Sequence, residues 1–291
     1  MFKIISDGGC DFTTQEVEQH KIDIVPFYIT LDQTNFLKEG VDIAKEDYFN
    51  RLKEDKKLHP KTAQPSPQDF IDVIKPYIED NQDVVVLTIS SKLSGTNNSA
   101  RLAAEMLKND YPARTVLVID SLNVSVGQGL ILRELIKMRD NGLSINEIEE
   151  QINKVIPTAK VYFTLSSLEY LRRGGRVGPT TALIGGLLGL RPVLHIVDGA
   201  VDQLDSVRGN KKVLKLIEEG LTVALKDSID KVNISVGHIL KADEIQTLKE
   251  NIENALNIKI TNPIAEVGVT IGTHAGPGAF VVAYCRKYES L

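Results

Sequence analysis

The stretch Val84-Val-Val-Leu-Thr-Ile-Ser-Ser-Lys-Leu-Ser-Gly-Thr-Asn-Asn-Ser99 joins the most hydrophobic run of the chain to a helix predicted over 100–108. A short apolar, β-branched run is typical of a strand buried on both faces, as in a parallel sheet. The polar loop follows the carboxyl end of that strand, where open α/β sheets bind ligands. Ser94, Gly95 and Thr96 would stand at a helix N-terminus, which favours an anionic group. We interpret the segment as a hydroxyl-rich ligand loop. A Ser94 nucleophile is the alternative, although no G-x-S-x-G elbow surrounds it.

On either side of this stretch, short aliphatic runs alternate with helix-period segments, which predicts an α/β fold with a largely parallel sheet. Strands are predicted over 2–6, 24–31, 84–89, 115–119, 161–165, 192–197, 201–207, 232–236, 258–260 and 280–284. Helices are predicted near 211–225 and 242–256, and capping signals at Thr13, Ser66 and Ser144 mark three further helix starts. Asp198-Gly199 indicates a hairpin in the second half.

The length of 291 residues suggests two domains. We place the boundary near Pro157 and divide the chain into an N-terminal α/β domain, 1–160, and a C-terminal α/β domain, 161–291. The first would carry Thr62 and Ser94, and the second an arginine-rich loop and His274.

Composition excludes several classes of protein. A net charge of −5, 5% aromatic residues and no tryptophan argue against a nucleic-acid binder. Cys10 and Cys285 are too few for a disulfide framework or a thiolate metal site, and the five histidines lack metal-ligand spacing. Lys3 and Asp7 come too early for a signal peptide, so we expect a cytoplasmic protein. Aliphatic residues remain sufficient for an apolar small-molecule site.

Three more polar segments interrupt apolar surroundings. Residues 6–12, Ser-Asp-Gly-Gly-Cys-Asp-Phe, could present amides to an anion or simply form a tight turn. Thr62 lies just before a proline-started helix, so its hydroxyl either points into a cleft or makes local turn bonds. A lone histidine is usually structural, and the position of His274 in the glycine-rich segment 271–278 raises the odds of a functional role.

Two segments near the middle of the chain allow two interpretations each. Leu171-Arg-Arg-Gly-Gly-Arg-Val177 is a basic loop in an acidic protein; it suits an acidic partner or a phosphate, or it is a solvated turn. The apolar, glycine-rich segment 177–190 would either pack against a lipid-like chain or form a tightly packed helix.

Six segments, taken together and in order, resemble the DegV family of bacterial fatty-acid-binding proteins. They are Ser6-Asp-Gly-Gly-Cys-Asp11, Thr62-Ala-Gln-Pro-Ser66, Ser90-Ser-Lys-Leu-Ser-Gly-Thr96, Leu168-Glu-Tyr-Leu-Arg-Arg-Gly-Gly-Arg176, Arg191-Pro192 and Ile271-Gly-Thr-His-Ala-Gly-Pro-Gly278. The resemblance implies two α/β domains with a ligand tunnel between them. It implies a bound long-chain fatty acid as ligand, without a cofactor or metal.

The resemblance also assigns roles to residues. Thr62, Ser94 and His274 would bind the fatty-acid carboxylate, supported by Thr96 and Asn97. Arg172, Arg173 and Arg176 would dock a separate fatty acid kinase, which uses ATP to make acyl phosphate for phospholipid synthesis. We expect the tunnel to include Val25, Phe27, Ile184 and Leu188. The chain would then be a non-enzymatic, substrate-presenting subunit with transient membrane-surface contact. The alternative is a hydrolase or transferase that uses Ser94 or His274 covalently.

Overall fold

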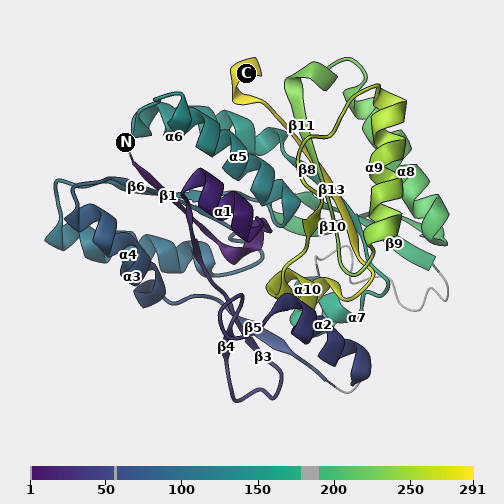
Figure 1. Ribbon diagram of the computed structural model, residues 1–291, viewed down its shortest axis with the longest axis horizontal. Helices are drawn as coiled ribbons and strands as arrows, with labels where there is room; N and C mark the ends of the chain where they lie inside the picture. The colour runs from purple at the N-terminus through teal and green to yellow at the C-terminus, as the bar shows by residue number, and fades with distance from the viewer. Residues whose placement is uncertain (1, 56–57, 178–189) are drawn as a thin grey trace.

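In the computed structural model, which describes residues 2–55, 58–177 and 190–291, the chain forms a four-stranded, a six-stranded and a three-stranded sheet with helices packed around them (Figure 1). The mixed α/β architecture agrees with the fold class predicted from the sequence.

The first sheet is parallel and has the strand order β2-β1-β6-β7. Its strands are β1 (Lys3–Asp7), β2 (Asp23–Val25), β6 (Val84–Thr88) and β7 (Val116–Asp120). β6 is buried at all five positions, because helices cover both faces of the sheet. α1 follows β1 on one face and α4 follows β6 on the other. The crevice at the carboxyl ends of β1 and β6 is therefore a topological switch point.

Helices sandwich this sheet, as Figure 1 shows with α3 and α4 on one side and α5 and α6 on the other. The helical segments around this sheet are η1 (Gly8–Cys10), α1 (Thr14–His20), α3 (Pro67–Glu79), α4 (Thr96–Asp110), α5 (Val126–Asp140), α6 (Ile145–Val155) and η2 (Ile156–Thr158). Three of the helix starts carry a capping box, on Thr13, Ser66 and Ser144. The capping signals in the sequence therefore predicted these starts correctly.

The six-stranded sheet has the order β10-β9-β8-β13-β11-β12. Its strands are β8 (Lys160–Thr164), β9 (Leu190–Val197), β10 (Ala200–Arg208), β11 (Val232–His238), β12 (Ala265–Glu266) and β13 (Phe280–Arg286). Every pairing except β11 with β12 is antiparallel, so the largely parallel arrangement predicted for the chain holds only for the first sheet. The predicted hairpin is present, with Asp198 and Gly199 both at positive φ.

The two faces of the six-stranded sheet meet different helices. α8 (Asn210–Leu225) and α9 (Ala242–Leu256) cover the outer face through an aliphatic cluster around Val236 and Phe280. The inner face packs on α5, which lies between the two large sheets. The remaining helical segments are α2 (Lys45–Glu54), α7 (Glu169–Gly174), η4 (Ile229–Lys231), α10 (Val269–Ala275) and η5 (Tyr288–Ser290).

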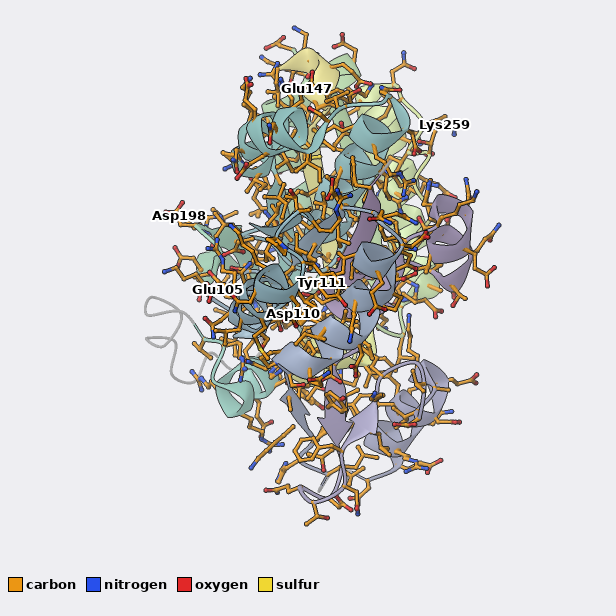
Figure 2. The ribbon with its side chains drawn as sticks, turned by 90° about the vertical axis from the view of Figure 1, so that its left-hand side faces the viewer. Glu105, Asp110, Tyr111, Glu147, Asp198 and Lys259 are labelled. Carbon is orange, nitrogen blue, oxygen red and sulfur yellow. The ribbon has the colours of Figure 1, made fainter. Side chains whose placement is uncertain are left out.

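The small sheet projects from the rest of the molecule at the bottom of both figures. It has the order β4-β3-β5, with β3 (Tyr28–Thr30), β4 (Leu37–Lys38) and β5 (Lys61–Ala63). Figure 2 also shows Asp198, at the tip of the β9–β10 hairpin, on the edge of the molecule. That tip reaches the loop after β6, where Ser90 Oγ donates a hydrogen bond to Gly199 O at 2.7 Å.

Two predicted strands were wrong in detail. The run predicted over 24–31 is split into β2 and β3, which belong to different sheets, because Pro26 has no N–H to continue a ladder. The strand predicted over 258–260 is absent from this described part of the chain. Asn257 ends α9 in a left-handed conformation, and Ile260 N donates to the Glu253 carboxylate instead of to a strand.

Strands of the first sheet end by Asp120, whereas those of the six-stranded sheet begin at Lys160. We keep the division into 1–160 and 161–291 as a proposal that fits this separation. α5 complicates it, because this helix belongs to the first half and packs on β8, β11 and β13 of the second.

Candidate functional site

A cavity of about 330 Å³ lies between the two large sheets and the small one. Ile89, Leu93 and Ser94 come from the loop after β6, as expected for the carboxyl end of a buried strand. Its wall is otherwise largely apolar and includes Phe27, Val161, Phe163, Val201, Ile239 and Val281. Since both halves of the chain contribute, the cavity forms only where they meet.

Polar side chains also line this cavity. Thr62 Oγ1, on β5, and His274 Nε2, on α10, share a hydrogen bond of 2.8 Å. Ser94 also lines the cavity, and its Oγ lies 2.8 Å from Thr96 Oγ1. The structure therefore brings together three residues that are far apart in the sequence and that we predicted to act together.

Arg176 lies at the same place. It lines the cavity, its Nε donates to Leu93 O at 3.1 Å, and its Nη1 donates to Gly174 O. This side chain connects the arginine-rich segment to the Ser94 loop. It is only partly exposed, unlike Arg172 and Arg173, which are exposed.

His274 is held as a neutral ring. Burial, together with the nearby Arg176 guanidinium, lowers the pKa of His274 to about 4. At neutral pH the imidazole therefore offers one donor and one acceptor nitrogen. With the Thr62 hydroxyl bonded to this ring and the Ser94 hydroxyl in the same cavity wall, the site can donate hydrogen bonds to an anionic oxygen without a histidine charge.

Gly174 lets α7 approach His274 closely. A Cβ atom added at Gly174 would lie 2.0 Å from His274 Nδ1, and one at Gly276 would lie 2.3 Å from the Tyr170 ring. These two glycines therefore allow α7 and the end of α10 to pack against each other. The position of the imidazole depends on this contact.

The other end of α10 is held by carboxylates from the first half of the chain. Gly268 N donates to Asp11 Oδ1 at 2.7 Å, and the Val269 and Thr270 amides donate to Glu39 Oε1. These bonds satisfy the amides that a helix start leaves unpaired. The two carboxylates also interact favourably with the positive end of the helix dipole. α10, which carries His274, is thus fixed at both ends.

Asp11 predicts a measurable pH effect. Burial raises the pKa of Asp11 from 3.8 to about 6. Between these two pKa values, the free energy of unfolding changes by about 1.4 kcal/mol for each pH unit. The unfolded chain loses this proton first as the pH rises. The stabilising contribution is therefore complete below pH 3.8 and is lost as the pH rises through 6. We expect the free energy of unfolding of the wild type, relative to Asp11→Asn, to fall by about 2.4 kcal/mol between pH 4 and pH 7. Urea denaturation of both proteins across this range measures it, and a constant difference would contradict the assignment.

The structure places the other predicted residues as follows. Thr96 is buried next to Ser94, whereas Asn97 donates to Thr88 Oγ1 at 3.0 Å and accepts from Arg101, in the core. Phe27 lines the cavity. Val25 does not line it, because it points to the opposite side and packs in the core cluster of Phe70 and Ile74. Ile184 and Leu188 lie outside the described residues.

The remaining predicted segments have local roles or exposed positions. The 6–12 turn is closed by the Asp7 carboxylate, which accepts from Gly9 N and Ile89 N. Ser66 is a helix cap, as its local interpretation predicted. Arg173 is exposed and donates to His59 Nδ1 and to Glu169.

Several residues that line the cavity were not predicted. Gln64, Ser125 and Thr270 add polar atoms to it. Ser125 is the N-cap residue of α5 and has a φ of 56°. Its hydroxyl donates to Asp11 Oδ2 at 2.5 Å. Thr270 lies within an apolar run, where the sequence carries no signal of a cavity.

No helix within the described ranges is both long and apolar enough to cross a membrane. Across those same residues, no group of three or more His, Cys, Asp and Glu side chains is arranged to hold a metal ion.

Comparison with known proteins places this site in context. The profile of a family described as uncharacterised protein, DegV family, matches residues 1–287. A DegV domain-containing protein of Caldanaerobacter subterraneus is 34% identical over 287 residues, which cover 98% of each chain.

Solved structures are similar over the same length. A stearic acid-binding protein from Eubacterium ventriosum has a TM-score of 0.95 at 31% identity, with 100% of both chains covered. A fatty acid-binding DegV family protein from Thermus thermophilus has a TM-score of 0.88 at 28% identity, covering 98% of this chain and 99% of its own.

Proposed function

The chain belongs to the DegV family, and from that membership we propose that it binds one long-chain fatty acid in the cavity between its sheets. Thr62, Ser94 and His274 hold the carboxylate, and the aliphatic wall holds the acyl chain. Thr96 supports Ser94, and Arg176 holds the Ser94 loop against the arginine-rich segment.

One observation carries this proposal: the hydrogen-bonded pair of Thr62 and His274 lies in the wall of a largely apolar cavity. Burying a methylene contributes about 0.8 kcal/mol, so roughly fifteen of them supply on the order of 12 kcal/mol before the costs of binding. The polar residues need only prevent an unsatisfied buried carboxylate, and hydroxyl groups with a neutral imidazole can do so.

Native mass spectrometry of the purified protein, followed by lipid extraction and gas chromatography, tests the proposal. The expected result is one co-purified acyl chain per protein, exchangeable for added oleate. Protein from lipid-containing cells that holds no acyl chain and takes up no oleate would overturn it.

We further propose that a partner kinase phosphorylates the bound carboxylate with ATP, giving acyl phosphate for phospholipid synthesis. The exposed positions of Arg172 and Arg173 suit a docking surface for that partner, whereas the contacts of Arg176 suit a role at the cavity.

Two variants separate docking from ligand binding. Ser94→Ala removes a headgroup hydroxyl and is expected to lower fatty-acid affinity about tenfold, the loss of one bond to a charged group. Arg173→Ala is expected to leave that affinity unchanged, while both variants lower acyl-phosphate formation by the kinase. Fluorescent fatty-acid displacement and a coupled ATPase assay measure the two effects. Normal kinase turnover with Arg173→Ala would show that Arg173 does not dock the kinase.

The covalent alternative requires a nucleophile paired with a base. Here Ser94 Oγ lies against Thr96 Oγ1, and His274 Nε2 lies against Thr62 Oγ1. Ser94 is therefore not hydrogen-bonded to a base among the described residues, which favours binding over covalent use of Ser94. An acyl-enzyme mass, or turnover without a partner, would favour the alternative.

A further inference from the structure

A glycine stands behind the apolar wall of the cavity. Gly127 is buried in the first turn of α5, the helix that packs on the inner face of the six-stranded sheet (Figure 1). Gly127 does not line the cavity, whereas Val161, on β8, does. Val161 is 1% exposed and belongs to the same core cluster as the apolar side chains of α5.

The contact between these two residues requires a glycine. A Cβ atom added at Gly127 would lie 2.2 Å from Val161 Cγ2 and 2.5 Å from Asn123 Oδ1. The Asn123 oxygen is at the end of a side chain that can turn. Val161 Cγ2 is bonded directly to the Cβ of a β-branched residue, whose χ1 is stiff, so it yields only if the whole side chain moves. Because a protein core is close-packed, the open space that can receive it is the cavity.

Val161 belongs to the part of the wall that contacts the acyl chain. Phe163, two residues later on β8, also lines the cavity. The carboxyl end of β8 leads to α7, where Gly174 packs on His274 of the headgroup site. Since a strand advances about 3.3 Å per residue, Val161 lies about 7 Å further from that end than Phe163 does.

We propose that Gly127 is a specificity-determining residue: it leaves room for Val161 behind the wall and thereby sets the length of acyl chain that the cavity accepts. The inference rests on the proposed fatty-acid binding. A side chain at position 127 would push Val161 into the cavity and reduce the space for the far part of the chain. The groups that hold the carboxylate would stay in place, so the preference among fatty acids changes and not their affinity as a class.

The test compares Gly127→Ala with the wild type on laurate, myristate, palmitate and stearate. Affinities are measured by displacement of a fluorescent fatty acid from delipidated protein. In the variant we expect the ratio of stearate affinity to laurate affinity to fall about tenfold, the effect of burying roughly two fewer methylene groups. Laurate should lose less affinity, because a shorter chain needs less of the wall.

Further variants assign the effect to this contact. Val161→Ala removes the methyl groups that a Cβ at position 127 would meet, so adding it to Gly127→Ala should restore the wild-type ratio. Val161→Ala alone enlarges the cavity and should raise the affinity for arachidate relative to stearate. Gly220→Ala is the matched control, because Gly220 is a glycine of helix α8 and nothing lies within 4 Å of a Cβ added there. That control should leave the ratio unchanged.

The outcomes separate this inference from the proposed function. A folded Gly127→Ala protein with the wild-type ratio, or a double variant in which the ratio is not restored, would overturn the role of Gly127 while fatty-acid binding stands. If Gly127→Ala does not fold, Val161→Ala decides the question, and an unchanged preference between arachidate and stearate overturns the inference. If the wild type binds none of these acids, the proposed function is overturned together with the inference.

Discussion

Replacing Gly174 with valine is expected to lower fatty-acid affinity by about 100-fold, which corresponds to about 2.7 kcal/mol. The reason is steric. Even a Cβ atom at this position would lie 2.0 Å from His274 Nδ1, so the imidazole must leave its place beside Thr62. The ligand carboxylate would then lose at least one bond in a buried site, where bonds to charged groups are worth roughly 1.5–3 kcal/mol each.

The neighbouring glycine supplies the control. Gly175 has a φ of 69°, and nothing lies within 4 Å of a Cβ added there. Asparagine tolerates the left-handed region, so Gly175→Asn should keep both the fold and the affinity. Displacement titrations on both variants, with circular dichroism to verify folding, measure the effect. A folded Gly174→Val protein of unchanged affinity would show that the imidazole position does not matter for binding.

Replacing Glu134 with leucine is expected to lower the free energy of unfolding by about 2–4 kcal/mol, the cost of leaving two partly buried donors without their acceptor. The Glu134 side chain is completely buried on α5. Its carboxylate accepts from Lys137 Nζ at 2.8 Å, from Asn233 Nδ2 on β11 at 2.6 Å, and from Tyr288 N at 2.8 Å. Leucine would leave the Asn233 and Tyr288 donors, which belong to the second half of the chain, without their acceptor, whereas the Lys137 ammonium is 42% exposed and can bond to water.

Urea denaturation at pH 7 measures this loss. Glu134→Gln keeps an acceptor oxygen and should lose clearly less stability than Glu134→Leu. Because Glu134 does not line the cavity, the folded fraction of either variant should bind fatty acid with wild-type affinity. If wild type and Glu134→Leu were equally stable, the hydrogen bonds of Glu134 would not contribute to the packing of α5 between the two halves.

Local signals in the sequence predicted much of the fold. The apolar run of β6 and the capping boxes at Thr13 and Ser144 depend on neighbouring residues, and each was confirmed. Apart from the β9–β10 hairpin, the antiparallel order of the second sheet was not predicted, because the other pairing partners are distant in sequence. Val25 was misplaced for a related reason. The chain changes direction at Pro26, so Val25 packs in the core while Phe27 lines the cavity.

The site was predictable only in part. Thr62 and His274 are separated by 212 residues, and in the sequence only the resemblance to a family links them. The need for a glycine at 174 depends on a contact with another helix. This property has no local sequence signal.

Because both halves of the chain hold α10 in place, they should unfold together. Asp11 and Glu39 of the first half hold one end of this helix, and α7 of the second half packs on the other. Neither half, expressed separately, would contain a complete pocket. A bound acyl chain thus favours only the assembled molecule, and by mass action a ligand at 100 times its Kd adds about 2.7 kcal/mol to stability. Occupancy should therefore be readable as a rise in melting temperature and as resistance to proteolysis between the halves.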